Sequence, residues 1–181
     1  MRTTLLVVVA LGASASPAVA EGFRNSRCLL PKLGLLPATV TTLTAIPGTI
    51  SFTAVNPDSG AVSGSSVATV QFLVLSGSPS RNWTVNARTA GSSFTGCSTV
   101  PVSAVTVTCA SAAVTGSGGS GSASCGGAFP LSTVDQQVAG GVQKNGTGSY
   151  TVQINFTLAE SWRYVANSSC TLSILYTVNA L

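Results

Sequence analysis

The sequence has 181 residues and a formal net charge of +4; only 7% of its residues are charged, whereas 45% are hydrophobic. This composition excludes a disordered chain, and the length is that of one ordinary domain with its own core. The complete absence of histidine excludes a Ser-His-Asp triad and leaves general acid–base catalysis to four acidic residues.

The first twenty residues have the pattern of a secretory signal peptide. Arg2 supplies a positive charge, an apolar run follows from Leu5 to Leu11, and Ala18-Val19-Ala20 matches a small-residue cleavage site. The apolar run, about seven residues long, is too short to span a membrane. We expect residues 1–20 to be removed before Glu21, leaving one secreted domain without an integral membrane segment. Its expected location is extracellular, periplasmic or at the cell surface.

The basic residues of the expected mature chain do not form a cluster. They are spread along the sequence as Arg24, Arg27, Lys32, Arg81, Arg88, Lys144 and Arg163. Surfaces that bind nucleic acids gather their positive charges on one face, so we expect no nucleic-acid partner.

Apolar and polar residues alternate in many short stretches, which is typical of strands with one buried face. The stretches predicted as strands are, in chain order, Ala38–Ala45, Ile50–Ala54, Val67–Leu75, Trp83–Arg88, Val105–Cys109, Leu131–Val142, Tyr150–Leu158 and Cys170–Asn179. No stretch has sustained helical periodicity, and only Glu160–Ala166 is expected to form a single helical turn. Regular strands separated by turn signals predict an all-β fold, namely an immunoglobulin-like antiparallel β-sandwich of about eight strands. A small barrel is the alternative.

Three connections between these strands carry further expectations. The last two alternating runs are expected to pair with each other as antiparallel strands. Gly91–Thr99 is expected to be a plain connection. Gly116–Gly127 is so dense in Ser and Gly that it predicts a flexible loop, tethered by Cys125.

All five cysteines lie in the expected mature chain, where an oxidising compartment favours disulfides. Our first choice is Cys97–Cys109, because the segment between them can fold back as a strand pair, followed by Cys125–Cys170. This choice leaves Cys28 unpaired; Cys28–Cys170 with Cys125 unpaired is the alternative. Without histidine or a C-x-x-C pair, zinc is improbable, and we expect no metal and no cofactor.

One polar–aromatic cluster is a candidate for ligand contact. Trp162, Arg163 and Tyr164 are adjacent in the sequence, and an exposed cluster of this kind stacks on a sugar ring or on a partner surface. The favoured alternative is that Trp162 caps the open end of the sandwich and Tyr164 bonds to the backbone there. Asp135 and Glu160 are the one pair of acids that a glycosidase-like site would use, although two solvated surface acids are far more common.

Part of the first half resembles a known family. Ile50 and Phe52, then Val70 and Phe72, then Trp83 and Val85 match the short strand motifs of bacterial secreted immunoglobulin-like modules of the BACON type. The resemblance covers about a third of the chain and implies an extracellular β-sandwich used for adhesion or glycan contact, with no catalytic residues.

These observations predict a secreted, non-catalytic structural or adhesive protein. One version is a self-assembling, pilus-like subunit, in which the irregular segment Glu21–Thr44 or the terminal strand ending at Leu181 pairs with the sheet edge of a neighbour. A carbohydrate-binding module is the alternative.

Overall fold

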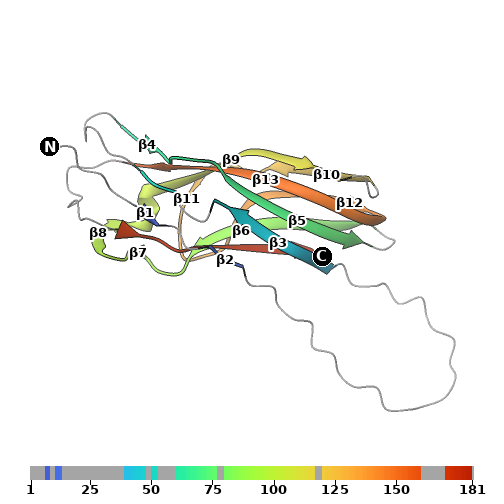
Figure 1. Cartoon of the computed structure of the whole chain (residues 1–181), viewed down its shortest axis with the longest axis horizontal. Coiled ribbons are helices and arrows are strands. Elements are labelled where there is room, and N and C mark those ends of the chain that lie inside the picture. The colour runs from blue at the N-terminus through green and yellow to red at the C-terminus, as the bar shows by residue number, and fades with distance from the viewer. Residues whose placement is uncertain are drawn as a thin grey trace, which may run out of the picture.

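The computed structural model describes residues 7–8, 11–13, 39–47, 50–52, 60–76, 80–116, 120–159 and 170–180. In these residues the chain forms two packed β-sheets and one short 3-10 helix, Val102–Ala104 (Figure 1). No helix among them is long and apolar enough to cross a membrane. The predicted all-β antiparallel sandwich with disulfides is therefore confirmed.

The first sheet, called sheet I here, has the strand order β10-β12-β6-β15-β2. All neighbouring strands in it are antiparallel except β2, which runs parallel to β15. The strands are β10 (Ser120–Cys125), β12 (Gln136–Lys144), β6 (Arg81–Thr89), β15 (Ile174–Ala180) and β2 (Leu11–Ala13).

The second sheet, called sheet II, has the order β11-β9-β13-β5-β3, and β4 pairs with the end of β13. Every pairing in it is antiparallel. The strands are β11 (Phe129–Pro130), β9 (Val105–Val114), β13 (Gly146–Leu158), β5 (Ala68–Ser76), β3 (Thr39–Ile46) and β4 (Val62–Ser63).

Two small strand pairs lie outside the main sheets. β7 (Ser93–Phe94) pairs with β8 (Cys97–Pro101), and β1 (Val7–Val8) runs parallel to β14 (Cys170–Thr171). The expected plain connection over Gly91–Thr99 is wrong, since β7 and the first part of β8 occupy it.

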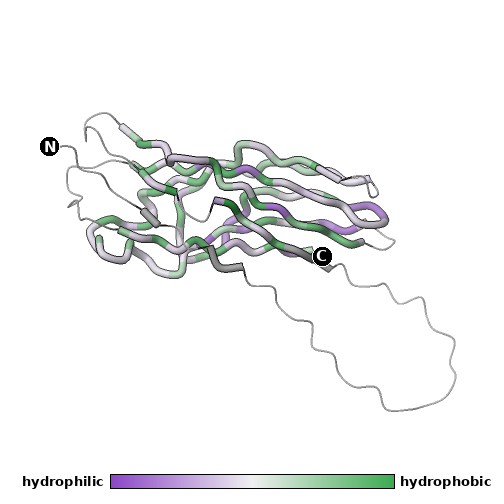
Figure 2. Tube along the Cα trace, in the orientation of Figure 1, coloured by the Kyte–Doolittle hydropathy of each residue, from purple (hydrophilic) through white to green (hydrophobic). Residues whose placement is uncertain are grey.

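The core forms where the inward faces of the two sheets meet. Along β5 and β13 buried residues alternate with more exposed ones, as a period of two requires. Hydrophobic residues accordingly recur along the strands of both sheets (Figure 2). At the centre, the ring of Trp83 lies 5.1 Å from that of Phe72 and 4.6 Å from that of Tyr150, measured between centroids. These aromatic contacts join sheet I to sheet II, because Trp83 belongs to β6 and the other two rings to β5 and β13.

The expected pairing of the last two long strands is wrong. β13 lies between β5 and β9 in sheet II, whereas β15 pairs with β6 in sheet I. The alternation identifies the buried face of each strand correctly, but periodicity carries no information about which strand is its neighbour.

The Gly/Ser-rich stretch is also different from the expectation. Residues 120–125 form the edge strand β10, which pairs with β12 from Ser120↔Lys144 to Cys125↔Ala139. Its serines alternate with Gly121, Ala123 and Cys125, and small side chains let the strand lie closely over the core.

Candidate functional site

The cysteine pairing differs from the expectation in its connectivity. The structure contains Cys97–Cys170 and Cys109–Cys125, not Cys97–Cys109 and Cys125–Cys170. β8 pairs with β7 rather than with β9, so Cys97 and Cys109 are not brought together, whereas β10 lies beside β9 and places Cys125 at Cys109. Cys28 lies outside the described residues. Two disulfides are compatible with an oxidising environment.

The two disulfides have different surroundings. Cys97 and Cys170 are buried, and their bond fixes the start of the chain segment that becomes β15. Cys109 is half-buried and Cys125 exposed, and their bond joins sheet II to sheet I along one side of the sandwich.

The predicted aromatic cluster cannot be placed. Trp162, Arg163 and Tyr164 all lie outside the described residues, so their role as a ligand contact stays a prediction. Among the aromatic side chains in the described part, all are buried except the half-buried Phe129. Sugar stacking needs an exposed ring, and this part of the chain offers none.

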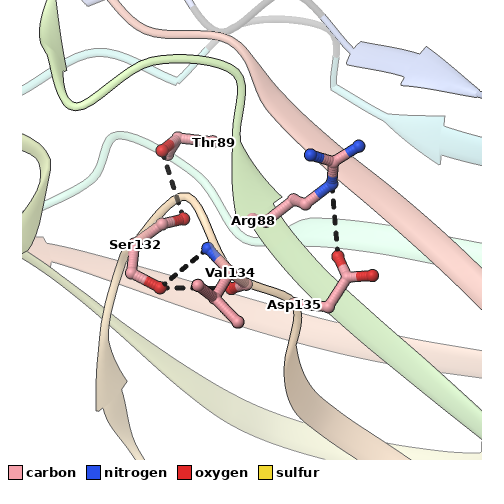
Figure 3. A network of polar contacts seen from close by, with 5 residues as sticks. All are labelled: Arg88, Thr89, Ser132, Val134 and Asp135. Atoms are coloured by element: carbon pink, nitrogen blue, oxygen red, sulfur yellow. Dashed lines mark hydrogen bonds and ion pairs between the residues drawn. The ribbon is translucent and has the colours of Figure 1, made fainter.

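Asp135 has a structural partner. Its Oδ1 lies 3.3 Å from Nε of Arg88, and both side chains are roughly half exposed (Figure 3). The same loop is tied to β6, because the Thr89 hydroxyl donates to the backbone oxygen of Ser132 at 3.2 Å. Glu160, its proposed catalytic partner, lies outside the described residues. No group of three or more potential metal ligands occurs in the described ranges.

A buried polar cluster lies between β10 and β13. The Tyr150 hydroxyl donates to Oε1 of Gln143 at 2.5 Å, and the Gln143 amide donates to the backbone oxygen of Asn145 at 3.0 Å. A Cβ on Gly121 would collide with the Tyr150 hydroxyl, so β10 approaches this closely only with glycine at that position. Burial raises the pKa of Tyr150, and the neighbouring indole of Trp83 lowers it by a smaller amount. The cluster is enclosed and serves packing.

Sheet II has an unusual surface composition. All four charged residues in the described part, Arg81, Arg88, Asp135 and Lys144, belong to sheet I or to the loop before β12. The strands of sheet II carry no charged residue among their described positions, yet Leu75 is 46% exposed and Ile46 is 58% exposed. We call the outward side of this sheet the uncharged face. Both leucine and isoleucine on such a surface favour contact with another apolar or neutral surface.

On one long side of the sandwich, the described strands pair with only part of the sheet edge. There β3, the edge strand of sheet II, lies against β15 and β2 of sheet I (Figure 1). β2 pairs only with Ile174–Tyr176, so the remainder of β15 has no strand beside it on that edge in the described part. We call this edge of β15, with the adjoining β3, the open edge.

Comparison with protein-family models, curated proteins and solved structures found no match to this chain. The geometry of the chain itself must therefore carry the functional argument.

Sequence reasoning missed both candidate contact surfaces. The uncharged face could have been predicted from the sequence. The three predicted strands from Ala38–Ala45 to Val67–Leu75 contain no charged residue, and neither does Tyr150–Leu158. The open edge was not visible, since the order of strands in a sheet decides which edges remain unpaired.

Proposed function

We propose that the protein is a secreted, non-catalytic structural or adhesive β-sandwich of the cell surface that acts through self-association. The observation that carries the proposal is the uncharged face. Soluble domains usually keep charged residues over much of their surface, and they place charges on edge strands, where these charges prevent pairing with a neighbouring molecule. A sheet of six strands without a described charge, exposing Leu75 and Ile46, has the chemistry of a contact surface.

Secretion and the absence of catalysis rest on separate support. The signal-peptide pattern before Glu21 predicts export, and the two disulfides fit an oxidising compartment. The whole sequence lacks histidine, and Asp135, the one acid in the described ranges, is paired with Arg88. The BACON-type resemblance agrees with an adhesive role and remains a prediction.

The test is the mass of the secreted chain starting at Glu21, measured by analytical ultracentrifugation over a wide concentration range. We expect concentration-dependent oligomers. The double substitution Gln71→Lys with Leu75→Lys places two charges on the uncharged face and is expected to weaken association by about tenfold or more. Both side chains are exposed, so the fold tolerates the change.

A matched control places the same charges on sheet I. Asn82→Lys with Ser122→Lys also changes two exposed residues and adds the same net charge. We expect this control to associate like the unmodified chain. A chain that stays monomeric at every concentration contradicts the proposed function.

A further inference from the structure

The disulfide Cys109–Cys125 is the more accessible of the two described disulfides. Cys125 is exposed and Cys109 half-buried, whereas Cys97 is 4% and Cys170 is 0% exposed. A disulfide opens when a thiolate reaches one of its sulfur atoms, so access decides which bond is attacked first. A thiol in solution therefore reaches Cys109–Cys125 in the folded chain, but reaches Cys97–Cys170 only after the surrounding core has opened.

Strand β10 has few attachments besides this bond. None of its six residues is buried, and Ala123 is its one apolar residue that packs against the core. As the edge strand of sheet I, it pairs with β12 alone. A strand with so little apolar burial gains little from the hydrophobic effect. Its position therefore depends on one ladder of backbone bonds and on the covalent bond to β9.

β10 also covers groups of the core that lie beneath it. Gly121 lies against the Tyr150 hydroxyl, which donates to Gln143, and a Cβ on Gly121 would collide with that hydroxyl. The residues Ala139–Gln143 of β12 pair with β10 on this edge of the sheet. Release of β10 therefore admits water to the Tyr150 hydroxyl and leaves the outer edge of β12 unpaired.

The rest of the described fold has attachments that do not involve β10. β12 keeps β6 as its second neighbour, and β9 keeps β13. Cys97–Cys170 joins β8 to β14, away from β10, and closes a separation of 73 residues. Opening of Cys109–Cys125 therefore frees one edge strand and leaves the remaining strands of both sheets paired.

We propose that Cys109–Cys125 is a redox-sensitive latch, which a dithiol reductant opens to release β10 while Cys97–Cys170 stays closed. One thiolate of the reductant attacks Sγ of Cys125, the bond between the two protein sulfurs breaks, and Cys109 leaves as a thiolate that takes up a proton. The second thiol of the reductant then attacks the mixed disulfide and frees Cys125 as a thiol. Two electrons pass to the protein, and the reductant ends with its own two sulfurs joined.

The position of Cys109 favours a dithiol over a single thiol. While β10 remains paired with β12, Cys109 stays beside Cys125 at a high effective concentration. Its thiolate therefore attacks the mixed disulfide and closes the bond again before a second monothiol molecule arrives. A dithiol carries its second thiol on the same molecule, so it competes with Cys109 and completes the reduction.

The experiment treats the folded chain starting at Glu21, carrying Cys28→Ser, with dithiothreitol in the absence of denaturant. The latch is independent of the proposed self-association, so one low protein concentration suffices. Alkylation and mass spectrometry report each cysteine over time. We expect Cys109 and Cys125 to be labelled about tenfold or more faster than Cys97 and Cys170. Glutathione at the same thiol concentration should leave both bonds closed.

Hydrogen–deuterium exchange on the same samples reports the release of the strand. In the chain with Cys109–Cys125 reduced, the amides of β10 should exchange about tenfold or more faster than in the oxidised chain. The amides of β13, which has neighbours on both sides, should remain protected at the same labelling times. Reoxidation should restore the protection of β10.

Each other outcome contradicts the latch in a defined way. Reduction of both disulfides at the same rate means that access does not select between them. Selective reduction without faster exchange in β10 means that pairing with β12 alone holds the strand. Loss of protection in β13 at the same labelling times means that the bond supports the whole fold. Equally complete reduction by glutathione overturns the requirement for a dithiol.

A matched pair of glycine substitutions tests the coupling between β10 and the bond without removing a cysteine. Gly121→Ala places a Cβ against the Tyr150 hydroxyl and loosens β10, whereas a Cβ on Gly127 meets nothing within 4 Å. A looser strand lowers the effective concentration of the two thiols, so Gly121→Ala should lower the dithiothreitol concentration at half reduction by about fivefold or more. Gly127→Ala should not change it. Equal midpoints for the two variants would show that β10 and the bond are not coupled, and would overturn the latch.

Discussion

The two long sides of the sandwich are closed in different ways. On one side β9 of sheet II and β10 of sheet I lie together, and Cys109–Cys125 joins them covalently. On the other side β3 and β15 meet, with only the short β2 pairing to part of β15. On the first side, described strands and a disulfide of the same chain join the two sheets. On the second side, the strand that pairs with β15 is β2, which lies within residues 1–20 of the expected signal peptide.

The same difference appears in two buried tyrosines. Tyr150, packed under β10 on the covalently joined side, donates to Gln143 and lies over the backbone of Gly121. Tyr176, on β15 at the open side, has a buried hydroxyl with no partner. The buried hydroxyl of Tyr150 on the closed side thus has a hydrogen-bond partner, whereas that of Tyr176 on the open side has none.

The largest expected effect concerns the bond that anchors the open side. Cys97→Ala with Cys170→Ala removes a disulfide that spans 73 residues and fixes the chain just before β15. In the chain-entropy model this costs about 4 kcal/mol of unfolding free energy. We expect a melting temperature lower by about 10 °C in calorimetry, in a Cys28→Ser background that prevents thiol exchange.

Removing the bond of the closed side should cost less. Cys109–Cys125 spans 16 residues, and the same model gives about 3 kcal/mol for a loop of that length. Cys109→Ala with Cys125→Ala should also accelerate amide exchange in β10 more than in β12, which keeps β6 as its second neighbour. An equal loss from both double variants would show that loop length does not govern these disulfides.

These comparisons also show which features of the fold could be predicted from the sequence. The alternation of apolar and polar residues predicted β3, β5, β6, β9 and β13, because each strand has one buried face and one solvent-facing face. That alternation is a property of the single strand. The pairing of β13 and the partners of Cys97 and Cys109 depend on the order of strands, which periodicity does not encode. β10 was missed because its composition suggested a loop. The alternation of Ser120, Ser122 and Ser124 with Gly121, Ala123 and Cys125 is the signal from which this strand could have been predicted.

The tyrosine pair provides a sharper test with matched substitutions. Tyr150→Phe removes the bonds to Gln143 and to the backbone oxygen of Val142, at 2.5 and 3.3 Å. We expect a loss of about 1.5 kcal/mol in chemical denaturation, because a buried acceptor loses its donor. Tyr176→Phe removes a hydroxyl that has no partner, so the change should lie within about 0.5 kcal/mol of zero or be stabilising. Equal destabilisation by both substitutions would contradict the difference between the two sides.

Alkaline titration tests the same two groups without altering the fold at neutral pH. Burial raises the pKa of Tyr150 and of Tyr176 above the ordinary value of 10.0. The folded protein therefore holds these protons more tightly than the unfolded chain. The resulting stability is fully present below pH 10 and is lost as the pH rises above it, by up to about 1.4 kcal/mol per tyrosine and pH unit. Urea denaturation at pH 8, 10 and 11 measures this slope, and either Tyr→Phe variant should reduce it.

The smallest expected effect concerns a surface ion pair. Arg88 and Asp135 form an ion pair in which the side chains are 43% and 45% exposed, so water and salt screen most of the attraction. Arg88→Ala should lower the unfolding free energy by no more than about 0.5 kcal/mol, with little difference between low and high salt. The loop it contacts remains attached to β6, because the Thr89 amide still donates to the backbone oxygen of Ser132 at 2.8 Å and the Thr89 hydroxyl donates to the same oxygen at 3.2 Å. A loss comparable to that of Tyr150→Phe would mean that this pair, and not the backbone bonds of Thr89, holds the loop beside sheet I.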